Sequence, residues 1–469
     1  MSAAYESGPG ETWQGYSDRA VAVLAIAAVA GVWAGWSAGL VIAAGLVSGI
    51  AVVLGRHRWV ALGAGVLLVV GGWCGERAWE RAEARATGPF TGWATLMTDP
   101  APVGRGVGVV LEIEGERFQT YAYGSARRRL ERRQAGERVA VVGQRSPLAP
   151  DDRRARVRHV VGRFEIERVA ASTTGTGVAR ASNRLRSRLR SSAEASMSPV
   201  DAALFTGLVV GDDTRQPREV IERFRAVGLS HLTAVSGQNV AYTLAVAGVL
   251  LRRLSRWWRL AATWALIAWF VVLTRVEPSV VRAGTMAGIG ALAFALGRDR
   301  SVPRVLAITV TALVLIDPML VWSVGFWLSC GATAGVSVVG PWLAARWRGP
   351  SWLAVPVGST VGAQLGVLLP SLLVFGRMPA LGIVTNLLAV PVAGFVMLAG
   401  IPTALVASLL PGWLVGPVMA PAALGTRWVA TVAAVAERLT PEGGWAVVAW
   451  VVQVLVALWW WRPSRTSRA

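Results

Sequence analysis

Long, continuously apolar stretches alternate with short arginine-bearing loops along most of this chain, and one long polar segment interrupts them. A helix that crosses a bilayer needs ~20 apolar residues, and these stretches recur at about that length. They are uniformly apolar and do not alternate between apolar and polar residues, which excludes the strands of an outer-membrane barrel. The pattern therefore predicts an α-helical polytopic membrane protein.

Residues 1–75 are predicted to hold about three membrane helices. The apolar run 20–54 is too long for one span and breaks at Gly35-Trp36-Ser37, and a third span covers 60–74. Between them lies Arg56-His57-Arg58, and short basic loops stay in the cytoplasm under the positive-inside rule. This assignment places the N-terminus in the cytoplasm and the segment after the third span outside.

The polar segment, residues 76–175, predicts a small domain outside the membrane. Short runs rich in valine and aromatic residues, separated by Asp-Pro, Gly or Pro-Asp turns, are typical of strands. Five strands in so short a segment favour a small closed barrel of the oligonucleotide-binding (OB) type. The runs are 91–98, 106–114, 117–123, 137–142 and 157–168.

A basic linker, residues 176–199, follows this domain. Its arginines predict an amphipathic helix that is solvated or associated with lipid headgroups. They are Arg180, Arg184, Arg186, Arg188 and Arg190.

Residues 200–469 are predicted to form a second membrane domain. Arginine clusters between its apolar runs fall on the cytoplasmic side when the polar domain is outside, so both halves of the chain agree on about twelve spans with both termini inside. Prolines make 387–422 one kinked helix or two short ones. The predicted spans are 232–251, 260–274, 280–296, 302–316, 320–344, 352–375, 381–409, 414–436 and 445–461.

Composition narrows the class further. Charged residues make up 16% of the chain, which excludes an ordinary soluble enzyme, where about 25% is usual. The net charge of +20 comes from arginine alone, either through genome bias or because phosphates of lipid or nucleic acid are partners. Cys74 and Cys330 are far apart, and the chain has 3 histidines, so no metal site, cofactor or disulfide is predicted. No cleavable signal peptide is evident.

Polar residues inside apolar runs carry most of the functional information, because a bilayer makes them costly unless they line a cavity or pair. The largest group lies between 204 and 239 and ends in Ser236, Gln238 and Asn239. These side chains could coordinate a substrate or cap a broken helix, or they could serve close helix packing. A hydrolase using Ser236 with His231 is disfavoured, since five residues on a helix place side chains ~140° apart.

The run 204–239 resembles the signature of the ComEC competence family, membrane proteins that pass single-stranded DNA into bacteria during transformation. Further blocks match in order and extend the resemblance over most of the chain, and the family's external OB-like domain agrees with residues 76–175. The blocks are Pro278-Ser279 to Arg282-Ala283 and Met286, Asp317-Pro318 to Leu328-Ser329, Gln364 to Pro370 with Phe375-Gly376-Arg377, and Asn386 to Pro391.

Two departures from the family pattern qualify this resemblance. Gln238-Asn239 stands where many members have a Leu-His pair, so no role of that histidine is carried over. Many members also continue into a metallo-β-lactamase-like domain, which this chain, ending at Ala469, is expected to lack. We therefore expect a non-enzymatic channel whose nuclease, DNA receptor and motor ATPase are separate proteins, since no Gly-rich phosphate loop is present.

The resemblance and the residue types together give two candidate sites. Arg282 and Arg377 could meet phosphates, could pair with Asp317 or Asp212, or could lie in the lipid headgroup zone. The translocation path comprises Asp212, Asp213, His231, Ser236, Gln238, Asn239, Arg282, Asp317, Gln364, Arg377 and Asn386. The DNA-binding set of the external domain comprises Arg117, Phe118, Tyr121, Tyr123, Arg154, Arg156 and Arg158.

Both sets have plainer alternatives. Basic and aromatic residues bind single strands through phosphates and stacked bases, but the external set could equally be a solvated surface with core aromatics. A transporter of another anionic polymer or a lipid-linked substrate is the alternative function.

Overall fold

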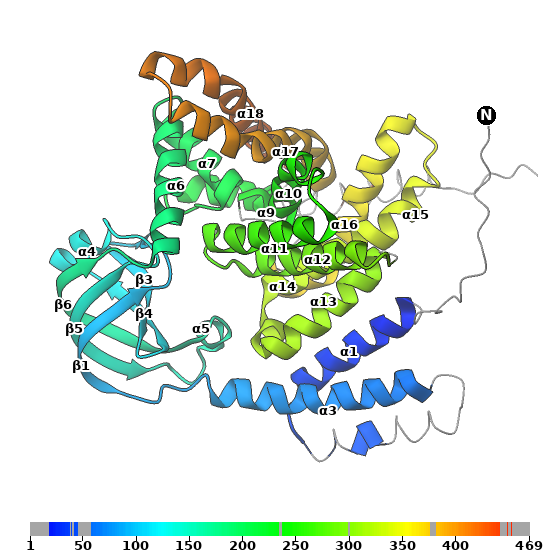
Figure 1. Ribbon diagram of the computed structural model, residues 1–469, viewed down its shortest axis with the longest axis horizontal. Helices are drawn as coiled ribbons and strands as arrows, with labels where there is room; N and C mark the ends of the chain where they lie inside the picture. The colour runs from blue at the N-terminus through cyan, green and yellow to red at the C-terminus, as the bar shows by residue number, and fades with distance from the viewer. Residues whose placement is uncertain are drawn as a thin grey trace, which may run out of the picture.

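The structure is a computed structural model that describes residues 18–37, 39, 42–45, 58–233, 237–298, 301–375, 381–440, 448 and 452. A sheet-containing domain lies at one end of a helical domain (Figure 1). Six helices of the described residues are long and apolar enough to cross a membrane, which agrees with a polytopic membrane protein; the total of about twelve stays a prediction. They are Trp59–Glu80, Pro278–Ala295, Val324–Ala344, Ser351–Val374, Gly382–Ala407 and Gly412–Leu439.

Two N-terminal helices, α1 (Asp18–Ala34) and α3 (Arg58–Glu80), pack closely together. The chain leaves α1 at Gly35, whose φ of 68° suits glycine, so the predicted break is confirmed. A Cβ on Gly71 of α3 would lie 2.6 Å from the Ala28 carbonyl oxygen of α1. Glycine at this position therefore lets the two backbones approach. Most of the second predicted span lies outside the described residues.

The residues predicted to form a barrel form one six-stranded sheet, in the order β1-β5-β6-β4-β3-β2. Neighbouring strands are antiparallel except β4 and β6, which are parallel. The strands are β1 (Gly88–Leu96), β2 (Ala101–Val103), β3 (Gly106–Ile113), β4 (Glu116–Ala122), β5 (Arg138–Pro147) and β6 (Val160–Thr173).

All five predicted strands are present. The structure has one further strand, β2, which was not predicted because 3 residues are too few to show the alternation typical of a strand. β1 also pairs with β3, but only through Thr95–Glu112 and Leu96–Leu111. The architecture is therefore a sheet, and the predicted closed barrel is not established.

α6 (Gly177–Glu194) links the sheet domain to the helical domain and runs across the direction of α11 (Arg256–Leu273) and α12 (Pro278–Ala295) (Figure 1). The next helix, α7 (Pro199–Val210), is buried at every residue from Ala202 to Val210. A helix that is apolar on all sides lies in a core, and α7 packs against α6, α17 (Gly382–Ala407) and α18 (Gly412–Leu439). α7 is too short to span, and the predicted spans omit it.

The remaining helices follow the predicted spans closely. α17 continues through Pro391 and Pro402, and α18 begins after Pro411, so 387–422 is divided between two helices. Most of the predicted span 445–461 lies outside the described residues. The other elements are α4 (Gly124–Leu130), α5 (Arg153–Val157), α8 (Arg218–Ala226), α9 (Ser230–Thr233), α10 (Gly237–Leu251), α11 (Arg256–Leu273), α12 (Pro278–Ala295), α13 (Val302–Ile316), η1 (Pro318–Trp322), α14 (Val324–Ala334), η2 (Gly335–Val339), α15 (Gly340–Ala344), α16 (Ser351–Phe375), α17 (Gly382–Ala407) and α18 (Gly412–Leu439).

A seam of glycines joins α14, η2 and α15 to α16. A Cβ on Gly362 of α16 would lie 2.5 Å from the Gly335 carbonyl oxygen and 2.9 Å from the Gly340 amide nitrogen. Small residues are what allow such close contact between membrane helices. The predicted single span 320–344 therefore consists of a 3₁₀ turn (η1), two α-helical pieces and, at the seam, a π-helical turn (η2).

Candidate functional site: a charged junction and a buried arginine

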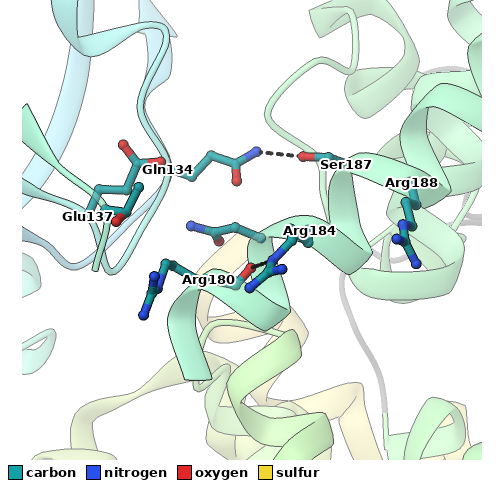
Figure 2. Close-up of a pocket in the computed structure, with 8 residues that line it drawn as sticks. Gln134, Glu137, Arg180, Arg184, Ser187 and Arg188 are labelled. Carbon is teal, nitrogen blue, oxygen red and sulfur yellow. Dashed lines mark hydrogen bonds between the residues drawn. The ribbon is translucent and has the colours of Figure 1, made fainter. Parts of the chain in front are cut away.

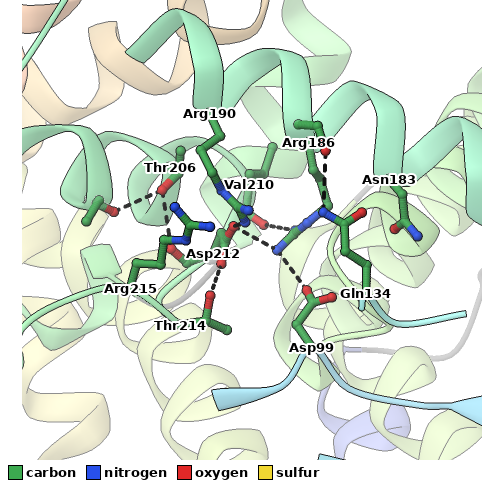
Figure 3. A network of polar contacts seen from close by, with 12 residues as sticks. Asp99, Gln134, Asn183, Arg186, Arg190, Thr206, Val210, Asp212, Thr214 and Arg215 are labelled. Carbon is green, nitrogen blue, oxygen red and sulfur yellow. Dashed lines mark hydrogen bonds and ion pairs between the residues drawn. The ribbon is translucent and has the colours of Figure 1, made fainter. Parts of the chain in front are cut away.

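A buried network of charged side chains lies where the sheet domain meets the helical domain (Figure 3). Asp99 follows β1, Arg186 and Arg190 belong to α6, and Asp212 follows α7. Arg186 Nη2 lies 3.2 Å from Asp99 Oδ2 and 3.4 Å from Asp212 Oδ2, and Arg190 also donates to Asp212. Arg186 and Asp212 are each only 3% exposed. Both charges thus depend on their protein partners rather than on water.

Arg186 also bonds to the main chain of two helices. Its Nη1 donates to the carbonyl oxygens of Val210, at 3.2 Å, and Leu273, at 3.0 Å. These carbonyls end α7 and α11, where helical backbone has no intrahelical partner. One guanidinium therefore ties two helix ends to the aspartates on either side of it.

Asp212 is held in its charged form. Burial alone would raise the pKa of its carboxyl group, but the charges of Arg186 and Arg190 oppose this, and the pKa falls from 3.8 to about 2. The Thr214 hydroxyl donates to Asp212 Oδ1 at 2.6 Å and adds to the effect. Asp212 is therefore the fixed counterion of α6.

Arg275, in the loop between α11 and α12, also binds Asp99. Its guanidinium is bidentate, with Nε 3.0 Å from Oδ2 and Nη2 2.9 Å from Oδ1, and Nη2 also donates to Asn183 Oδ1 at 2.7 Å. Arg275 and Val276 have φ values of 62° and 58°, which cost a non-glycine residue about 1–3 kcal/mol. The bidentate pair holds the loop in this conformation.

A second contact joins the two domains. His159 Nε2, after α5, lies 3.0 Å from Asp317 Oδ2, and Asp317 also caps η1 by accepting from the Met319 amide at 3.1 Å. Nearby, desolvation raises the pKa of Glu277, the charge of Asp213 adds to this, and Arg158 opposes it. The connection between β5 and β6 therefore lies against acidic loops of the helical domain.

Deeper in the helical domain, two of the predicted path residues lie around the start of α10. Asn239 is buried and donates to the carbonyl oxygens of Leu208 at 2.8 Å and Val209 at 3.4 Å, which cap α7. A Cβ on Gly237, two residues earlier, would lie 3.3 Å from Arg282 Nη2. Asn239 thus fulfils the helix-capping alternative, and Arg282 lies next to the same turn.

Arg282 is 4% exposed and lies beside two hydroxyl groups and the Met286 sulfur. It donates to the Ser329 and Thr333 hydroxyls of α14, the latter at 3.2 Å, and its Nε has no hydrogen-bond partner in the described structure. For Arg282, the predicted alternative of pairing with Asp317 or Asp212 is wrong, since those carboxylates bind His159 and the α6 arginines. Among described residues, no carboxylate forms an ion pair with Arg282.

The other predicted path residues do not join this group. His231, Asp213 and Gln238 are exposed, and Gln364 is half-buried on α16. Asn386 donates to its own helix at Gly382 O, 2.7 Å away. Ser236 and Arg377 lie outside the described residues.

The residues of β4 that were predicted to bind DNA lie on opposite faces of the sheet, because side chains alternate along a strand. Arg117 and Tyr121 point away from the core, whereas Phe118 is 0% exposed and lies in the sheet's hydrophobic core. The prediction that Phe118 stacks on bases is therefore wrong. Tyr121 and Tyr123 are exposed, as are Arg154 and Arg158, and Arg156 is half-buried.

Sequence reasoning missed Asp99 and Arg275, and it assigned Arg186 to a solvated helix. The Asp99-Pro100 step signalled a turn but not a partner 176 residues away. The structure brings cations and carboxylates together at the junction and places hydroxyl groups beside Arg282. The residues that the structure describes contain no group of three His, Cys, Asp or Glu side chains that could hold a metal ion.

Comparison with known proteins agrees with the family resemblance. Residues 208–464, which include Asp212, Asn239 and Arg282, match the family model described as Competence protein. Uncharacterized protein YcaI of Escherichia coli (strain K12) is 27% identical over 240 residues, 48% of this chain and 32% of that protein. Competence protein ComA of Neisseria gonorrhoeae is 28% identical over 221 residues, 44% of this chain and 30% of that protein.

These matches span about a third of the length of the two relatives. No solved structure matches the chain. The family match covers more than half of the chain and contains Asp212 and Arg275 of the junction as well as Arg282, and the chain therefore belongs to the Competence protein family.

Proposed function

We propose that this chain is a channel that conducts single-stranded DNA across the cytoplasmic membrane during natural transformation. The observation that carries the proposal is the family match over 208–464. A DNA strand carries one phosphate per nucleotide, so its path requires basic and polar groups. Arg282 suits such a path, because its guanidinium meets hydroxyls and its charge can be offered to a phosphate.

The sheet domain, in this proposal, is an OB-type unit that binds the strand. The order β1-β5-β6-β4-β3, the second pairing of β1 with β3, and the parallel pair β4 and β6 support that topology. OB domains bind oligonucleotides on their second and third strands and in the connections beside them. β3 and β4 occupy those positions here, and the exposed Tyr121 of β4 offers a stacking surface.

The connections of this domain also support a transfer of the strand into the membrane. Asp99 lies between β1 and β3 and contacts Arg186 and Arg275, while His159 lies between β5 and β6 and contacts Asp317. Both connections that bind oligonucleotides in OB domains thus face the helical domain. A strand bound there would lie next to the loops that precede α12 and α14.

We further propose that the sheet domain is extracytoplasmic and that both termini are cytoplasmic. Asp18, at the start of α1, pairs with Arg304 at 2.9 Å and accepts from Ser301 at 2.5 Å, so two segments assigned to the cytoplasm lie together. The partners of the proposed channel are lipid, single-stranded DNA, a DNA receptor, a motor ATPase and a nuclease. No cofactor and no enzymatic step are proposed.

Deletion of the gene tests this function. Labelled DNA should still bind at the cell surface but should no longer reach the cytoplasm. As a matched pair, Arg282→Lys should retain more uptake than Arg282→Gln, since lysine keeps the positive charge. Normal uptake in the deletion strain would overturn the DNA channel. If an anionic polymer or lipid-linked substrate accumulates there instead, the second transporter class replaces it.

A further inference from the structure

The outward face of α6 carries a row of three arginines that the junction does not use. Arg180, Arg184 and Arg188 recur every four residues, so they lie one above another over ~12 Å of helix. All three are exposed and line a groove of about 600 Å³ between α6 and the start of β5 (Figure 2).

The charge of this row is not neutralised within the described structure. Arg184 Nε donates to the Arg180 carbonyl oxygen at 3.4 Å, and no ion pair is formed by Arg180, Arg184 or Arg188 with a described carboxylate. The acid that lines the groove, Glu137, pairs with Arg133 at 3.6 Å. Three cations therefore face the groove together.

The groove also has polar groups that hold its two walls together. Gln134 Nε2 donates to Ser187 Oγ at 3.4 Å across the groove, and Asn183 and Thr174 complete the lining. Asn183 donates to Ala135 O at 3.2 Å and accepts from Arg275, so the groove shares a wall with the junction. Every residue that lines the groove has a polar or charged side chain, which suits an anionic ligand.

We propose that this groove is a binding site for the phosphate backbone of single-stranded DNA. It is located where the DNA would pass from the sheet domain to the helical domain. The inference rests on the proposed function, and it deepens it by naming an entry site. Phosphates of one B-form strand advance ~3.4 Å per nucleotide and those of an extended strand advance further, so a row of ~12 Å meets about three phosphates. Arginine donates to phosphate oxygens in a planar fork, which favours this residue type here.

The direct test measures how tightly a fluorescent oligothymidylate of twelve nucleotides binds the full chain in zwitterionic nanodiscs over a series of salt concentrations. The variant R180Q/R184Q/R188Q should bind at least about tenfold more weakly at low salt, and its log–log salt slope should be smaller by about 2, from ~0.7 per phosphate lost. R180K/R184K/R188K should keep the slope. The matched control R252Q/R253Q/R256Q removes the same charge from the loop after α10 and the first residue of α11, and it should bind normally.

Unchanged affinity and slope in the triple glutamine variant would overturn the site. A second outcome would also overturn the site. If the triple glutamine variant binds DNA normally, but short-chain phosphatidylglycerol raises the Tm of the wild type and not of the variant, then the groove is a lipid headgroup site. Uptake measurements separate this proposal from the channel. Uptake that is lost on deletion yet normal in the triple variant overturns only the groove, whereas uptake that survives deletion overturns the channel and leaves the binding assay to decide on the groove.

Discussion

The two faces of α6 use the same residue type in opposite ways. Arg186 and Arg190 face the junction and share Asp212 as counterion, whereas Arg180, Arg184 and Arg188 face a groove without a described ion pair. The two sets are centred about 140° apart around the helix. What separates them is the presence of a carboxylate from elsewhere in the fold, so pairing, and not the arginine itself, decides between a structural and a binding role.

The largest effect should come from removing the paired face. Arg186→Met leaves Asp212 and Asp99 with one arginine fewer and leaves the Val210 and Leu273 carbonyls without this donor. Breaking a buried ion pair from one side costs about 3–5 kcal/mol. Thermal unfolding of the purified protein should show this loss, whereas Arg188→Met, on the open face, should change stability by less than about 0.5 kcal/mol. Equal losses in the two variants would abolish the distinction between the faces.

A smaller effect is expected at the contact that docks the sheet domain. Asp99→Asn keeps the shape of the side chain but removes the charge that Arg186 and Arg275 share. Hydrogen bonds to charged groups contribute about 1.5–3 kcal/mol, so we expect a loss of about 2 kcal/mol. A double-mutant cycle with Arg275→Gln should give a coupling energy of about 1–3 kcal/mol. Strict additivity of the two substitutions would show that the bidentate pair does not hold the domains together.

Acid should weaken the ion pairs of Arg186 and Arg190 with Asp212 and should not affect the face of α6 whose arginines have no described ion pair. The pKa of Asp212 is about 2 in the folded protein and 3.8 in the unfolded reference, so its stabilisation is complete above pH ~4 and is lost as the pH falls towards 2. The shift corresponds to about 2 kcal/mol. Stability measured from pH 5 to pH 2 should show this loss in the wild type. Asp212→Asn should be less stable at neutral pH and should lack this part of the acid response; an unchanged acid profile in Asp212→Asn contradicts the assignment.

Much of the architecture could be predicted from the sequence, because it rests on local patterns. Apolar run length located the long helices, and turn residues located five strands. Burial within an element was harder. Phe118 and Tyr121 are only three residues apart, and strand parity alone places the first in the core and the second on the surface.

The junction could not be predicted, since it depends on contacts between distant segments. Asp99 meets Arg275 across 176 residues, and periodicity within α6 does not show which of its arginines will find that aspartate. The buried polar residues could be named from their cost in a bilayer, but whether Asn239 capped a helix or lined a path depended on the carbonyls of α7.

The smallest effect on stability, and the sharpest test of the comparison, comes from giving the open face its own carboxylate. Ser187 is exposed in the groove, three residues from Arg184 and adjacent to Arg188. Ser187→Asp should alter stability by no more than about 0.5 kcal/mol, as surface ion pairs do, but should reduce the salt slope of oligothymidylate binding by about 0.7 because one arginine is neutralised. Asparagine has nearly the same shape as aspartate but carries no charge, so Ser187→Asn should bind as the wild type does. If Ser187→Asp and Ser187→Asn bind alike, then the free charge of the row does not matter, and pairing is not what distinguishes the two faces of α6.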